Sequence, residues 1–176
     1  MDGDLQHPPE KVPFFLKELT GGSEYVLGTR YGEGFAVDKD WPWYRVVISK
    51  GARLLARPLT PLSDPMSGFF GMTKTALRRG KSNISPVGFK IALELYVKCG
   101  APKHSEVQIF FAKREAGQSK LTGKVMVYYV LHLAQLYWFR FPALVVVAVA
   151  IALIILLMMI YVVLFGSNSG GRPKVA

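Results

Sequence analysis

The sequence predicts an α/β domain followed by one membrane-spanning helix. Through residues 1–140, short apolar runs typical of strands alternate with longer segments of helical periodicity, which is the pattern of an α/β fold on a largely parallel sheet. Residues 141–165 carry no charged side chain, and this run exceeds the roughly 20 apolar residues that a helix needs to cross a bilayer. The chain therefore combines a modest folded part with its own membrane anchor.

Periodicity and turn signals place the elements in order. We expect a helix over residues 12–19, a strand over 24–29, a basic amphipathic helix over 43–59, a strand over 67–72, a helix over 88–99, a strand over 107–111 and a helix over 123–139. Gly21 and Gly22 end the first helix, and the run EYVLGT has the length of a buried strand. In the basic helix, Val47, Leu54 and Leu55 fall near one face.

The later elements rest on similar signals. SGFFGM and VQIFF are short apolar runs of strand type, and GFKIALELYVKC has helical periodicity and ends before a Gly-Ala-Pro turn. The Tyr- and Leu-rich helix then runs into the apolar segment. We divide the chain into a domain of residues 1–122, an amphipathic interfacial helix of residues 123–140, a transmembrane helix of residues 141–165 and a flexible tail of residues 166–176.

The charge distribution predicts the orientation. The formal net charge is +10, and all lysines and arginines except Arg172 and Lys174 precede the apolar run. The excess of positive charge on one side of a span favours the cytosol for residues 1–140, and the single cysteine, Cys99, agrees with a reducing compartment. Because an anchored chain without a nucleic-acid motif has little reason to bind nucleic acid, we expect no such partner.

Three oxygen-bearing side chains at the start of the chain form a candidate metal site. Asp2, Asp4 and Gln6 stand at alternate positions, so an extended loop presents them on one side. Carboxylate and amide oxygens suit Mg²⁺ or Mn²⁺, which in turn holds a diphosphate. An acidic N-terminal tail has the same composition, and the triplet alone leaves both readings open.

Basic side chains gather in two stretches of the sequence. They are Arg30, Lys39, Arg45, Lys50, Arg53 and Arg57 in the first, and Arg114 and Lys120 in the second. Guanidinium groups bind phosphate through two donors at once. A surface facing anionic lipid headgroups has a similar composition, so the pattern fits either a phosphate site or a membrane-facing surface.

Taken together, five blocks of this sequence closely resemble the dolichyl-phosphate mannosyltransferases, inverting glycosyltransferases of GT-A (Rossmann-like) fold. The blocks are DGDLQHPPEKVP, YVLGTRYGEG, KDWPWYRVVISKGARLLARPLTPLSDPMSGFFGM, GFKIALEL and REAGQSKLTGKV. The resemblance runs from Met1 to about Trp138, and the single C-terminal span is similar to that of members that carry their own anchor.

The resemblance implies roles for specific residues. Asp2, Asp4 and Gln6 match the family's metal-binding triplet, and Asp64 matches a position that serves as base or sugar contact. The residues matching those that hold the phosphates of donor and acceptor are Arg30, Arg45, Arg114 and Lys120, with Ser119 orienting the last. The resemblance assigns catalysis to Asp64, Arg30 and Arg45, and substrate binding to Asp2 together with the phosphate-holding set.

The resemblance also implies a reaction and a location. We expect transfer of mannose from GDP-mannose to dolichyl phosphate, with a divalent cation, at the endoplasmic reticulum membrane and on its cytosolic side. The product, dolichyl β-D-mannosyl phosphate, would serve protein glycosylation and GPI-anchor synthesis.

One departure from the family keeps alternatives open. Members carry a nucleotide-binding half before the metal triplet, whereas this sequence begins at the triplet, so we expect an N-terminally truncated form. The alternatives are the related dolichyl-phosphate glucosyltransferase, which uses UDP-glucose, and an inactive membrane-anchored pseudoenzyme that binds dolichyl phosphate or a partner subunit.

Overall fold

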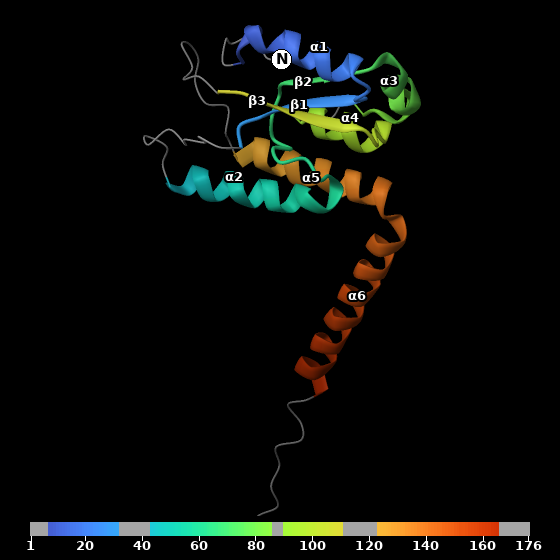
Figure 1. Ribbon diagram of the computed structural model, residues 1–176. Coiled ribbons are helices and arrows are strands. Elements are labelled where there is room, and N and C mark those ends of the chain that lie inside the picture. The colour runs from blue at the N-terminus through green and yellow to red at the C-terminus, as the bar shows by residue number, and fades with distance from the viewer. Residues whose placement is uncertain (1–6, 32–42, 86–89, 111–122, 166–176) are drawn as a thin grey trace, which may run out of the picture. The chain divides into compact units, whose positions relative to one another are not determined.

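The computed structural model describes residues 7–31, 43–85, 90–110 and 123–165, and it divides the chain into two compact units, Met1–Arg140 and Phe141–Ala176 (Figure 1). The described elements of the first unit, with η for a 3-10 helix, are η1 (Pro9–Lys11), α1 (Val12–Thr20), β1 (Tyr25–Thr29), α2 (Trp43–Ala56), η2 (Arg57–Leu59), β2 (Phe70–Met72), α3 (Lys74–Gly80), η3 (Lys81–Asn83), α4 (Ile91–Cys99), β3 (His104–Gln108) and α5 (Gly123–Arg140). The unit is mixed α/β, which confirms the expected fold class.

A three-stranded sheet with the order β2-β1-β3 organises the first unit. Strand β1 pairs with β3 in parallel, from Tyr25 opposite His104 to Thr29 opposite Gln108. Its other neighbour, β2, is antiparallel. The expectation of a largely parallel sheet therefore holds for one of the two pairings among the described strands.

Each face of the sheet packs against its own helix, with α1 on one side and α4 on the other (Figure 1). Side chains alternate across a strand. Tyr25 and Leu27 consequently join Leu95 and other residues of α4 in one buried cluster, while Val26 packs with Phe15 of α1 in the other. All five residues of β1 are buried, so the central strand is fixed from both faces and both edges.

Besides small shifts at helix ends, three elements differ from the sequence-based expectation. β2 begins at Phe70, three residues after the expected start. β3 begins at His104, three residues before the expected start, because backbone pairing with β1 extends through residues that are only partly buried. The short helix α3 lies where no helix was expected; Thr73 caps it by accepting a hydrogen bond from the amide of Ala76 at 3.2 Å.

The helices α2 and α5 lie side by side below α4 (Figure 1). The hydroxyl of Tyr129 donates to the Ala52 carbonyl, and that of Tyr137 to the Leu55 carbonyl, both at 2.7 Å. The inward side of α5 carries the buried residues His132, Leu133 and Leu136. Its other side is apolar too, with side chains such as those of Val127, Val130 and Leu131 exposed.

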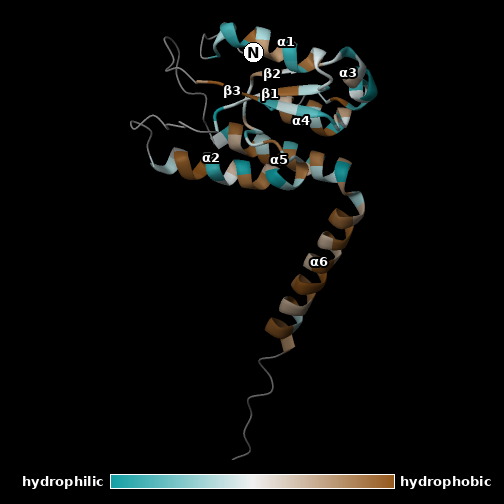
Figure 2. Ribbon diagram, in the orientation of Figure 1, coloured by the Kyte–Doolittle hydropathy of each residue, from teal (hydrophilic) through white to brown (hydrophobic). Residues whose placement is uncertain are grey.

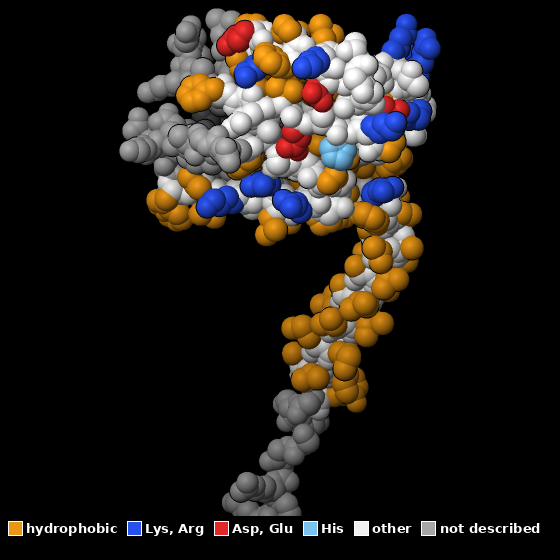
Figure 3. All heavy atoms as spheres, viewed as in Figure 1, with side chains coloured by type: hydrophobic (Ala, Val, Ile, Leu, Met, Phe, Trp, Pro, Cys, Tyr) orange, Lys and Arg blue, Asp and Glu red, His pale blue; other side chains and the backbone are white. Residues whose placement is uncertain are grey.

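The outer surface of α2 combines basic and apolar side chains, as Figure 3 shows over this helix. Trp43 and Leu54 are 77% and 73% exposed, although apolar side chains of this size are usually buried. An apolar surface of this kind marks a contact with a partner or a membrane.

The second unit contains α6 (Pro142–Phe165), which Figure 2 shows as hydrophobic along its length. From Ala143 to Phe165 the side chains of this helix are exposed, except that of Val145, which is partly exposed. By length and composition, α6 is able to cross a membrane, and it is the one such helix within the described residues.

Candidate functional site

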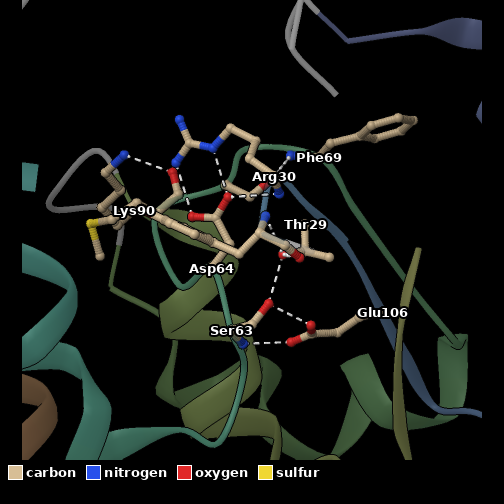
Figure 4. A network of polar contacts seen from close by, with 10 residues as sticks. Thr29, Arg30, Ser63, Asp64, Phe69, Lys90 and Glu106 are labelled. Atoms are coloured by element: carbon tan, nitrogen blue, oxygen red, sulfur yellow. Dashed lines mark hydrogen bonds and ion pairs between the residues drawn. The ribbon is translucent and has the colours of Figure 1, made fainter. Parts of the chain in front are cut away.

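The candidate site lies at the carboxyl ends of the parallel strands β1 and β3, the edge where open α/β sheets bind ligands. Two segments meet there: Thr29 and Arg30 end and follow β1, and a loop of residues 60–69 runs between η2 and β2. Figure 4 shows this region, with Ser63 and Asp64 of the loop directed at the end of β1 and Glu106 of β3 beside them. The sheet thus brings polar side chains from three segments together.

An ion pair joins Arg30 and Asp64 in the site. The guanidinium donates through Nε to Oδ2 of Asp64 at 2.6 Å and through Nη2 to Oδ1 at 2.9 Å. The backbone amide of Arg30 also donates to Oδ2, at 3.2 Å. The Asp64 side chain is 1% exposed and that of Arg30 is 20% exposed. A bidentate pair of this geometry holds the guanidinium plane in one orientation.

The charge state of Arg30 follows from this pairing. Burial of the guanidinium lowers its pKa, but the hydrogen bonds and the charge of Asp64 outweigh burial, and the pKa of Arg30 is raised above its ordinary value. Arg30 is therefore a permanent positive charge at the end of β1. Both oxygens of Asp64 accept from Arg30, so the geometry favours Asp64 as the anchor of Arg30 over a free general base.

The loop that carries Asp64 is itself anchored to the sheet. The Ser67 amide donates to the Asp64 carbonyl at 3.0 Å, and the Gly28 amide donates to the Phe69 carbonyl at 2.7 Å. A Cβ at Gly28 would lie 3.2 Å from the Phe69 ring and Cβ, so the absence of a side chain permits this close approach. Lys90 also holds the loop by donating from Nζ to the Met66 carbonyl at 3.0 Å.

A second set of hydrogen bonds runs beside the ion pair. The hydroxyls of Thr29 and Ser63 are 2.6 Å apart. The Ser63 amide donates to Oε1 of Glu106, and its hydroxyl to Oε2, each at 2.5 Å. Figure 4 shows the two carboxylates, Asp64 and Glu106, on either side of this short loop segment. Neither Ser63 nor Glu106 was predicted as a site residue: Ser63 lies within a block of the family resemblance but was given no role, and Glu106 lies outside the five blocks.

Helix α2 reaches the site through Arg53. Its guanidinium carbon lies 4.1 Å from the ring centre of Tyr31, the residue after Arg30, which is a cation–π contact. Arg45, a predicted phosphate-binding residue, belongs to the same helix, but its side chain lies outside the described structure. Among the predicted residues, the structure thus brings Arg30 and Asp64 together and places Arg45 on α2.

The remaining predicted residues lie outside the described ranges. They are Asp2, Asp4 and Gln6 in the expected metal triplet, and Arg114, Ser119 and Lys120 in the second basic stretch. The neighbour of the triplet, His7, is described: it is 2% exposed, and its ring lies 5.2 Å from that of Phe69, centre to centre. His7 therefore packs beside the loop that carries Asp64.

Other reactive groups in the described part of the chain have structural surroundings. Within it, no cluster of three or more His, Cys, Asp or Glu side chains suits a metal ion. Cys99 lies in a hydrophobic cluster, and burial raises the pKa of its thiol, which disfavours the nucleophilic thiolate. Glu94 and Lys98 of α4 form a buried ion pair at 2.7 Å, and His132 of α5 lies 3.5 Å from the same carboxylate.

Comparison with known proteins identifies relatives over most of the chain, although no family model matches it. The chain is 57% identical over 145 residues to the dolichol-phosphate mannosyltransferase of Mycosarcoma maydis, covering 80% of this chain and 49% of the relative. It is 50% identical over 149 residues to the dolichol-phosphate mannosyltransferase of Saccharomyces cerevisiae, covering 81% of this chain and 55% of the relative. The dolichol-phosphate mannosyltransferase of Pyrococcus furiosus is 41% identical over 140 residues, which are 77% of this chain and 39% of the relative.

The matches cover most of this chain but only part of each relative. The chain spans about half the length of the first two relatives. The matched share, about four-fifths of this chain, agrees with the extent of the resemblance in its motifs. Over these residues the chain is homologous to the dolichol-phosphate mannosyltransferases.

Proposed function

We propose that this chain takes part in the transfer of mannose from GDP-mannose to dolichyl phosphate. The observation that carries the proposal is the Arg30–Asp64 pair: a guanidinium fixed in one orientation by a buried carboxylate, at the edge of the sheet where ligands bind. It lies within a chain whose relatives are named dolichol-phosphate mannosyltransferases. A fixed cation of this kind suits a substrate phosphate.

The roles of the site residues follow from their positions. Arg30 contacts a substrate phosphate, and Asp64 keeps its guanidinium in place. Arg45, which shares α2 with the site residue Arg53, contributes a further positive charge. Arg114 and Lys120, with Ser119 orienting the latter, add charge from the segment after β3, and Asp2 contributes to donor binding.

Asp2, Asp4 and Gln6 are the residues that would hold Mg²⁺ or Mn²⁺. Their oxygen donors match the preference of these cations. The next residue, His7, is packed against Phe69 of the site loop. A cation bound there would offset negative charge on the departing diphosphate.

The transfer requires little proton movement. A phosphate monoester is anionic at neutral pH, so an oxygen of dolichyl phosphate attacks C1 of mannose without a general base. The bond from C1 to the diphosphate breaks, and its electron pair leaves with GDP. Attack in line with the leaving group inverts the anomeric carbon and gives a β-linked product. The positive side chains hold two repelling anions in reacting geometry, which is the larger contribution to the rate.

We also place the chain at the endoplasmic reticulum membrane, with residues 1–140 on the cytosolic side. α6 supplies the length and hydropathy for a span. The exposed apolar side chains of α2 and α5, interspersed with lysine and arginine, suit the interface of an anionic membrane. Anchorage of this kind keeps the chain at the membrane that holds a lipid-bound acceptor.

The test is reconstitution of the chain in vesicles with Mn²⁺, labelled GDP-mannose and dolichyl phosphate. We expect lipid-linked mannose, its loss in Arg30→Met, and its retention in Arg79→Met. The second variant removes an arginine that also pairs bidentately with a carboxylate, Glu24, with both bonds at 2.7 Å, outside the site. Absence of product from the unaltered chain, or equal loss in both variants, refutes the proposal.

A further inference from the structure

We propose that Glu106 is a positioning residue that acts through Ser63 on the orientation of the Arg30–Asp64 pair. The inference rests on the proposed function, because Arg30 is the residue there assigned to a substrate phosphate. Glu106 belongs to β3 and stands opposite Leu27 of β1 in the parallel register. It therefore links a third segment to the two that form the ion pair.

The direction of the hydrogen bonds along this link is determined by the available protons. Ser63 has one hydroxyl proton, and it donates that proton to the Glu106 carboxylate. The Ser63 oxygen must then accept from the Thr29 hydroxyl, which lies 2.6 Å away. Thr29 accepts in turn from the amide of Tyr31 at 3.1 Å. The result is a directed chain from Tyr31 through Thr29 and Ser63 to Glu106.

This series of hydrogen bonds includes the residues on both sides of Arg30 in the sequence. Thr29 precedes Arg30 and Tyr31 follows it, and both are members of the chain. On the opposite segment, Ser63 precedes Asp64. The two segments are thus joined by two adjacent connections, one between Thr29 and Ser63 and one between Arg30 and Asp64. A shift of Ser63 moves Asp64, and with it the guanidinium that Asp64 holds.

The occupancy of the Glu106 carboxylate argues against a direct chemical role. Its two oxygens accept from the Ser63 amide and hydroxyl, respectively, and hydrogen bonds to a charged acceptor are about twice as strong as neutral ones. A bare carboxylate beside a phosphate site would repel the substrate, whereas this one is directed at Ser63. Its position suits the support of neighbouring groups over contact with reactants.

The test combines a spectroscopic signal with kinetics. The Nε–H resonance of Arg30, assigned by its loss in Arg30→Lys, reports the ion pair directly. We expect Glu106→Ala and Ser63→Ala to shift this resonance and to lower kcat roughly ten- to hundredfold, the scale of a small misplacement. Glu106→Gln keeps one acceptor oxygen for Ser63 and should give an intermediate shift and an intermediate rate.

The control is Glu24→Ala, which removes a hydrogen-bonded glutamate next to the other end of β1, where its partner is Arg79. An Arg30 resonance that stays in place in Glu106→Ala, or that moves equally in Glu24→Ala, overturns the inference. So does a loss of activity that reflects only fewer folded molecules, with kcat per active site unchanged. If the unaltered chain transfers no mannose, the proposed function fails, and the Arg30 resonance alone still decides whether Glu106 positions the pair.

Discussion

Removing one partner of the Arg30–Asp64 pair should destabilise the first unit more than removing both. The Asp64 side chain is 1% exposed, so Arg30→Met leaves a buried carboxylate with a single remaining described donor, the backbone amide of residue 30. Loss of one member of a buried ion pair costs about 3 to 5 kcal/mol. We expect Arg30→Met near the upper end of that range.

Removing the other partner, Asp64, should lower the stability of the unit by less. Asp64→Leu leaves a guanidinium whose side chain is 20% exposed, and this group can recruit water. We therefore expect a loss near the lower end, about 3 kcal/mol. The double variant leaves no buried charge at this place, and an apolar pair of similar volume is often neutral relative to the ion pair. Its stability should return to within about 1 kcal/mol of the unaltered chain.

The assay is urea unfolding in detergent micelles, followed by the fluorescence of the three tryptophans, Trp41, Trp43 and Trp138, and by near-ultraviolet circular dichroism. The cycle of two single variants and the double variant gives the coupling energy directly. Additive single effects, with a coupling below about 0.5 kcal/mol, would refute the argument that the pair is a desolvated unit. Activity separates fold from function, because the double variant should regain stability and still transfer no mannose.

Three further results are expected. Gly80→Ala should destabilise the unit by about 1 to 3 kcal/mol, since the new Cβ would lie 2.5 Å from the Lys98 carbonyl oxygen. Gly51→Ala on α2, where a Cβ would meet open space, should instead stabilise the unit by about 0.5 to 1 kcal/mol. Thermal unfolding of both variants checks the sign of each change. Burial lowers the pKa of His132 by more than the nearby charge of Glu94 raises it. As the pH drops below about 6.5, the unfolded chain therefore binds a proton at His132 more readily than the folded chain does, and stability should fall. His132→Leu should flatten that part of the profile of urea midpoints against pH, and an unchanged slope would contradict the assignment. Ile154→Arg at the middle of α6 should raise the cost of membrane insertion by about 2.5 to 3.5 kcal/mol, seen as a larger fraction extracted by alkali than for Ile154→Leu.

The elements that the sequence predicted well are those whose pattern is local. The helices α1, α4, α5 and α6 have long apolar periodicity or clear stop signals, and their bounds agree with expectation to within a few residues. β3 was placed too late because the apolar run VQIFF was taken as the strand, whereas pairing with β1 selects the more polar HSEVQ, which shares only its last two residues with that run. Only tertiary contacts could settle that shift.

The helix α3 was missed for a different reason. Three of its seven residues are basic, and its short apolar face is centred on Ala76. The one local signal was Thr73, a favourable N-cap residue whose side chain does cap the helix. That signal is weak on its own, because Thr is common in loops as well.

The site was only partly predictable. The resemblance to a known family identified Arg30 and Asp64, but it did not indicate that they bind each other, since they are separated by 34 positions in the chain. Ser63, Glu106 and the stacking of Arg53 on Tyr31 depend on how three segments meet. Single polar residues of this kind carry no pattern that sequence periodicity can detect.

The central place of β1 has a consequence for how activity is lost. This strand is buried along its length and is bonded to a neighbour on each edge, so its amides should open to hydrogen exchange only when the whole unit unfolds. Arg30 follows that strand directly. Denaturant should therefore separate Arg30 from Asp64 in the same transition that unfolds the sheet, and any phosphate binding proposed for Arg30 should be lost in that transition, while helix ends fray at lower concentrations without effect on the pair.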